Sequence, residues 1–92
     1  MSFAQDSDIE KAKKYSDNND YVNAIKHYDA AAAILIDNKD YGRALECLRS
    51  SAQAYAFMNR EKEAVETLKK CEAIVAKYEL EDHDKLLNDL YY

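Results

Sequence analysis

The stretch that decides the fold is YVNAIKHY at residues 21–28, because it recurs as YGRALECL at 41–48 and as EKEAVETL at 61–68. The three copies begin at Tyr21, Tyr41 and Glu61, so the interval between them is constant. The matched positions within a copy fall at i, i+3, i+4 and i+7, which is one face of an α-helix and not the alternation of a strand. The pattern therefore predicts an internal repeat of amphipathic helices. The matched residues are Ala24, Ala44 and Ala64; Ile25, Leu45 and Val65; and Tyr28, Leu48 and Leu68.

Short polar segments at 18–20, 38–40 and 59–60 separate the helical units. Asn and Asp tolerate left-handed backbone and can cap a following helix, so they can end and restart helices where Gly and Pro are scarce. Asp20 and Asp40 are the predicted N-caps. The predicted helices are Ser7–Asp17, Tyr21–Asp37, Tyr41–Met58 and Glu61–Tyr78, with a short fifth helix at Glu81–Leu90.

The recurring alanine predicts how the helices pack. A methyl group at a crossing point lets two helix axes approach closely, while Tyr or Leu one turn later fills the adjacent groove. We therefore expect one all-α domain over residues 1–92, in which four to five antiparallel helices form a short hairpin solenoid or bundle. The second helix is apolar nearly all round, including Val22, Ala30 and Ala33, which indicates a central helix covered on both sides.

Composition excludes several classes of protein. The chain has 92 residues, one glycine (Gly42) and no proline, so a turn-rich sandwich or barrel and a Gly-rich phosphate loop are both ruled out. Its 48% apolar and 34% charged residues are typical of a globular protein. The net charge of −5 argues against a nucleic-acid partner, which would need clustered Lys and Arg.

Cellular location is also constrained by the sequence. The longest apolar run, Ala30–Ile36, is too short for an integral membrane segment, and the acidic amino terminus does not resemble a secretory signal. Cys47 and Cys71 fit neither a disulfide framework nor a metal motif, so we expect packed thiols in a reducing compartment. The predicted location is the cytoplasm, peripheral to membranes only through partners.

The segment 20–32, Asp-Tyr-x-x-Ala-x-x-x-Tyr-x-x-Ala-Ala, resembles tetratricopeptide-like repeats. Two units here span 40 residues instead of about 34, and the proline that often closes a unit is missing. Residues 9–74 are similar to the amino-terminal helices of the gamma form of the soluble NSF-attachment proteins (SNAPs), through KAKKY, NDYVNAIKHYDAAAAIL, KDYGRALECLRSSAQAY and EAVETLKKCEAI.

The SNAP resemblance implies a non-enzymatic adaptor of vesicle trafficking. Members of that family hold a SNARE helical bundle against a hexameric ATPase. They are much longer than this chain, and their ATPase-contacting region has no counterpart here, so the resemblance implies the amino-terminal scaffold of such an adaptor.

A second resemblance is to microtubule-interacting-and-trafficking (MIT) domains, on the pattern of residues 8–36. It implies a groove that binds amphipathic helices of ESCRT proteins. The strong fourth helix is more than that three-helix fold needs, so this interpretation ranks second. A small accessory subunit of a larger assembly is a further alternative.

Residues able to support catalysis are few. His27 is predicted at the edge of the helix stripe, and His83 lies among acidic neighbours without the i, i+4 spacing of a metal pair. Ser50 and Ser51 lack a nucleophile elbow. We therefore expect no enzyme, no cofactor and no metal, and the enzyme alternative would be revived by a turnover that depends on His27 or Cys47.

Apolar residues outside the stripe and basic residues on the helices mark the expected surface for a helical partner, either a SNARE bundle or an amphipathic peptide. The alternatives are that a fifth helix covers the apolar residues and that the basic residues only solvate the surface. The candidate interaction residues are Ile34, Ile36, Phe57, Met58, Ile74, Lys26, Arg43, Arg49, Lys69 and Lys70.

The carboxyl-terminal segment 79–92 is acidic, with five acidic residues and Lys85, and its leucines make it amphipathic. We expect it to cap the bundle; the alternative is a leucine-bearing peptide for another protein. The open end of the solenoid is also a candidate surface for a homodimer, because an uncapped repeat array exposes its last helix.

Overall fold

The computed structural model describes residues 4–79, and this part of the chain consists of four α-helices. The predicted all-α class is confirmed. The predicted fifth helix, Glu81–Leu90, and nearly all of the acidic segment lie outside the described residues. The helices are α1 (Ala4–Asp17), α2 (Tyr21–Asp37), α3 (Tyr41–Phe57) and α4 (Glu61–Glu79).

Three predicted helix ends need correction. Helix α1 begins at Ala4 and not at Ser7, and Asp6 in its first turn suits the positive end of the helix dipole. Helix α3 ends at Phe57, because Met58 is its C-cap. Helix α4 continues one residue beyond Tyr78, to Glu79.

The same turn follows α1, α2 and α3. Asn19, Lys39 and Asn59 have φ angles of 61°, 61° and 60°, so each adopts the left-handed conformation that ends a helix. The next amide donates to the carbonyl five residues back, from Asp20 to Tyr15 and from Asp40 to Leu35, each at 2.8 Å. The left-handed residue itself donates three residues back, as in a Schellman motif. Because this turn recurs at the same point of each repeat, it reverses the chain in the same way each time.

The two predicted N-caps differ. The Asp20 carboxylate accepts from the Asn23 amide at 3.4 Å and from the Asn23 side-chain nitrogen at 2.7 Å, as a cap should. Asp40 occupies the N-cap position of α3, but its side chain makes no capping hydrogen bond. Its carboxylate lies 3.7 Å from a guanidinium nitrogen of Arg43 instead.

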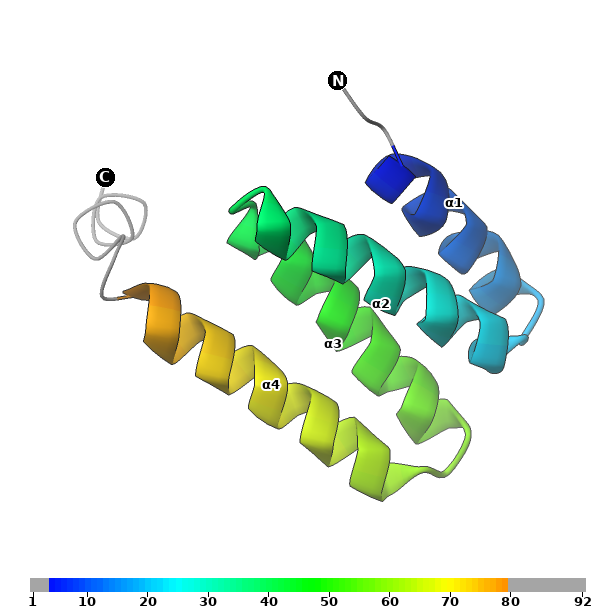
Figure 1. Cartoon of the computed structure of the whole chain (residues 1–92). Helices are drawn as coiled ribbons and strands as arrows, with labels where there is room; N and C mark the ends of the chain where they lie inside the picture. The colour runs from blue at the N-terminus through cyan, green and yellow to red at the C-terminus, as the bar shows by residue number, and fades with distance from the viewer. Residues whose placement is uncertain (1–3, 80–92) are drawn as a thin grey trace, which may run out of the picture.

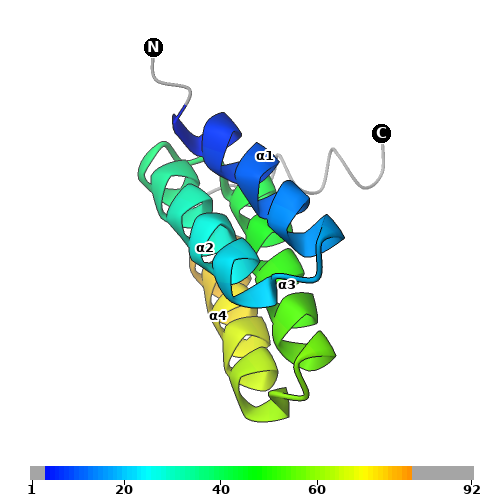
Figure 2. The ribbon, with the colours of Figure 1, turned by 90° about the vertical axis from the view of Figure 1, so that its right-hand side faces the viewer.

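The helices form two layers. Figure 1 shows successive helices running antiparallel, and Figure 2 shows α1 beside α3 in one layer and α2 beside α4 in the other. Extensive contacts among the described helices join α1 to α2, α2 to α3 and α3 to α4. The arrangement is a zigzag of helical hairpins, in agreement with the predicted short solenoid.

The core follows the predicted pairing of small and large residues in α2 and α3. Ala24 and Ala44 are completely buried at the helix crossings, and Tyr28 and Leu48 are buried one turn later. Leu35 is the largest apolar side chain that is fully buried in the described part of the chain. Helix α2 is covered by α1 and α3, as predicted, but Val22, Ala30 and Ala33 are exposed on its remaining face.

Polar contacts join α1 to α2 and α3. The Arg43 guanidinium of α3 donates to the Asp6 carboxylate at 2.7 Å, and Nδ1 of His27 lies 2.9 Å from the Asp8 carboxylate. The His27 ring also stacks on Tyr15, with ring centroids 5.4 Å apart. His27 thus has a structural role between α1 and α2.

Replacing Lys39 with glycine should stabilise the fold by about 0.5–1 kcal/mol, because a β-carbon in left-handed backbone costs more than the extra flexibility of glycine. A urea titration should show a higher midpoint with an unchanged slope. Asn59→Gly is the matched control and should gain less, because asparagine tolerates this conformation. An equal gain at both positions would contradict the explanation.

Candidate functional site

A groove runs between α2 and α4, with α3 as its floor. Its volume is about 430 Å³, and its surface is mainly apolar. Ala33 and Ala73 stand on its two walls and are exposed, so short side chains keep the groove open. The lining residues are Asp29, Ala32, Ala33 and Ile36 from α2, Leu48 and Tyr55 from α3, and Thr67, Lys70, Ala73 and Ile74 from α4.

Charges of opposite sign lie on the two walls of this groove. Asp29 on α2 accepts a hydrogen bond of 2.7 Å from the Ser51 hydroxyl, which holds the carboxylate beside the floor. Lys70 on α4 forms no ion pair with any residue in the range 4–79. Burial raises the pKa of the Tyr55 hydroxyl, and the charge of Asp29 acts in the same direction. An incoming segment would therefore meet an apolar floor between an acidic wall and a basic wall.

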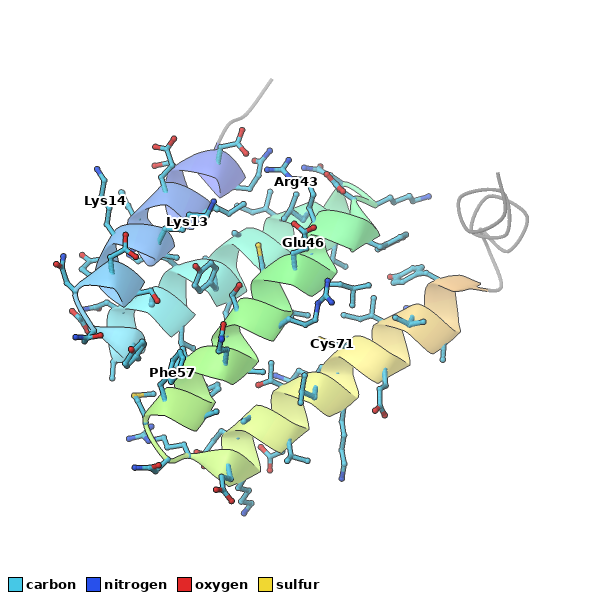
Figure 3. All side chains as sticks on the ribbon, turned by 180° about the vertical axis from the view of Figure 1, so that it is seen from behind. Lys13, Lys14, Arg43, Glu46, Phe57 and Cys71 are labelled. Carbon is cyan, nitrogen blue, oxygen red and sulfur yellow. The ribbon has the colours of Figure 1, made fainter. Side chains whose placement is uncertain are left out.

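A smaller groove of about 110 Å³ lies between α1 and α3, on α2. It is equivalent to the first groove by the internal repeat, because five of its lining residues have a counterpart one repeat later in the larger groove. Long side chains line it: Lys13 stands where the larger groove has Ala33, and Arg43 and Glu46 extend from α3 on its other side (Figure 3). The counterparts are Ile9 and Asp29, Lys13 and Ala33, Tyr28 and Leu48, Cys47 and Thr67, and Ser50 and Lys70.

The structure brings together only some of the predicted interaction residues. Ile36, Lys70 and Ile74 line the larger groove. Phe57 is exposed at the end of α3 (Figure 3), where its ring packs 5.3 Å from that of Tyr21. Arg43 is engaged with Asp6. Elsewhere, Lys26, Arg49 and Lys69 are exposed, and Ile34 and Met58 are half-buried.

Other residues of the surface were missed by the sequence analysis. Ala33 and Ala73 look like ordinary helix residues, and only the gap between α2 and α4 makes them groove walls. The sequence analysis expected an exposed last helix but did not name Val65, Leu68 and Val75 of α4, because they share a stripe that is buried in α2 and buried or half-buried in α3. They are 49%, 44% and 42% exposed. Their position on the last described helix was the signal that could have identified them.

The two free thiols are placed differently. Cys47 is buried in α3, whereas Cys71 of α4 is half-buried beside the core (Figure 3). Burial raises the pKa of both thiols, while the charge of Arg43 partly opposes this at Cys47 and that of Arg49 does so at Cys71. Across residues 4–79, no three His, Cys, Asp or Glu side chains are grouped to hold a metal ion.

Comparison with protein-family models, with curated proteins and with solved structures gave no match. Within the described part of the chain, none of the helices combines the length and the apolar character needed to cross a membrane. The groove is therefore the main structural feature on which a function can be proposed.

Iodoacetamide should alkylate Cys71 before Cys47 in the folded protein, because Cys47 is only 4% exposed. Both reactions should be slow at neutral pH and accelerate as the pH rises, since the thiolate is the reactive form. Mass spectrometry of peptides would give both rates, and in denaturant the two should converge. Faster modification of Cys47 in the folded state would contradict the packing of α3.

Proposed function

We propose that this chain is a non-enzymatic protein-interaction module that binds an amphipathic helix in the groove between α2 and α4. The observation that supports this is an apolar groove of about 430 Å³, open along two helices and bordered by Asp29 and Lys70. Helix-in-groove recognition needs an apolar channel that accepts anchors at i, i+3, i+4 and i+7. The opposite charges on the walls would select the direction in which a partner helix lies.

Within this class we propose a SNAP-like trafficking adaptor, or its amino-terminal part, with helical partners such as SNARE bundles. The support is the sequence resemblance over residues 9–74 together with the zigzag of helical hairpins. Recognition would combine the shape of the groove with the exposed cations Lys26, Lys69 and Lys70. We further propose a cytoplasmic location, at membranes only through these partners.

The MIT-type alternative is favoured by one specific observation. The binding site proposed here is a single groove between helices, which suits one short amphipathic peptide better than a whole bundle. The two candidates differ in the probe that binds: a preassembled four-helix SNARE bundle in the first case, and an isolated leucine-rich peptide in the second.

A purified four-helix SNARE bundle should bind the immobilised chain, and the affinity should fall as salt is raised, because exposed charges contribute to the association. Titration by calorimetry at two ionic strengths would measure this. Failure of the bundle to bind, with micromolar binding of the isolated amphipathic peptide, would support the MIT-type function instead. Failure of both probes would reject the groove as a helix-binding site.

Ala33→Asp and Ala73→Asp should each weaken partner binding at least tenfold, because each places an unpaired charge against the apolar face of the bound helix. Both alanines are exposed in the free protein, so the fold should survive. Ala76→Asp is the matched control: this alanine is also exposed on α4 but does not line the groove. Equal effects of all three substitutions on calorimetric affinity would argue against the groove.

A further inference from the structure

In α2 and α3, one stripe of apolar residues packs toward the next helix of the chain. The equivalent stripe of α4 is exposed. Tyr28 and Leu35 of α2 are buried, as is Leu48 of α3, and α4 carries their equivalents Leu68 and Val75 at the surface. Figure 1 shows why, since α4 packs on α3 at the edge of the described array and no described helix follows it.

This open face is a third groove with one wall missing. The floor of the α2–α4 groove is formed by Leu48 and Tyr55. Their equivalents one repeat later are Leu68 and Val75 of α4, which would form the floor of the third groove. The same shift by one repeat replaces the α2 wall with α3, so Arg49 stands where the earlier groove has Asp29. The missing wall would be the helix or segment that follows α4.

The charges beside the third groove differ from those beside the α2–α4 groove. Arg49 is exposed, and no carboxylate of residues 4–79 lies within ion-pair distance of it. Its charge is nevertheless felt at Cys71 of α4, which places it near the boundary between α3 and α4. Lys69, which adjoins Leu68 in the sequence, is exposed as well. A segment that docks near these cations should be apolar along one side and acidic on the other.

We propose that residues 80–92 of this same chain, which lie outside the described part, close the third groove by docking on Leu68 and Val75. This segment carries four acidic residues and one lysine, for a net charge of −3, and four leucines. It is joined directly to the end of α4. Tethering gives a short segment an effective concentration in the millimolar range, which favours it over a second copy of the chain.

The length of the segment is sufficient for this. Leu68 lies 11 residues before Glu79, which is about 16 Å along a helix, and 13 residues span about 20 Å even when helical. The repeat alone does not predict where this segment lies. The three earlier turns have a left-handed residue at the position equivalent to Glu79, but α4 is still helical there. The proposal therefore depends on charge and reach. It is independent of the α2–α4 groove and of its function.

Zero-length carbodiimide cross-linking of the full chain tests the docking directly. Peptide mapping should find Lys69 joined to an acidic residue of 80–92 within one chain. Leu68→Ser combined with Val75→Ser should lower the yield about tenfold, because the apolar contacts of the docked segment are lost. Val22→Ser, at an exposed valine on α2, is the matched control and should leave the yield unchanged.

Charge reversal provides a second arm of the experiment. Arg49→Glu should lower the cross-link yield severalfold, whereas Lys26→Glu, which changes the net charge equally on α2, should not. Slow alkylation of Cys47 in every variant would show that the fold is intact.

The proposal is overturned if the wild-type chain gives no such cross-link, or if the yield is the same after Leu68 and Val75 are replaced. A cross-link that joins two chains in a species of dimer size would assign the open face to a second copy, and would overturn it too.

Discussion

The fold depends on one backbone constraint: a single left-handed residue must end each of the first three helices, at Asn19, Lys39 and Asn59. That conformation bonds the amides of the turn back to the last carbonyls of the helix, and so fixes the direction in which the next helix leaves. Because the turn is the same each time, equivalent residues of each helix pack against the helix before it. The completely buried alanines Ala24 and Ala44 are therefore a consequence of the turn as much as of packing.

Grooves at equivalent places of the repeat differ in size and in their lining side chains. The α1–α3 and α2–α4 grooves lie at equivalent places of the repeat, but the smaller one is lined by Lys13 at the position where the larger one has Ala33. Specific surfaces can thus arise on a uniform scaffold by exchange of a few side chains that are not part of the core. The alanines of the core have no such freedom, because their methyl groups set the separation of the helices.

Sequence periodicity was enough to predict the four described helices and most of the buried stripe. The constant spacing of the repeat identifies Ala24, Tyr28 and Leu35 as core, whichever helix covers them. It could not predict which stripe residues stay exposed, as Leu68 does, because burial depends on a neighbour and not on the residue itself. Periodicity could not predict the grooves either, because Ala33 forms a groove wall only when α2 and α4 lie in one layer. Family resemblance suggested a partner but not a surface.

The contacts of this array are almost all between helices that follow one another in the chain, and this has a consequence for how the protein folds. Contacts of low sequence separation need little loop closure, so the polypeptide should reach its native state rapidly, in micro- to milliseconds. Such an array can also lose its terminal helix without dissolving the middle. Among the described helices, unfolding would then begin at α1 or α4, while α2 and α3 would be the last pair to separate.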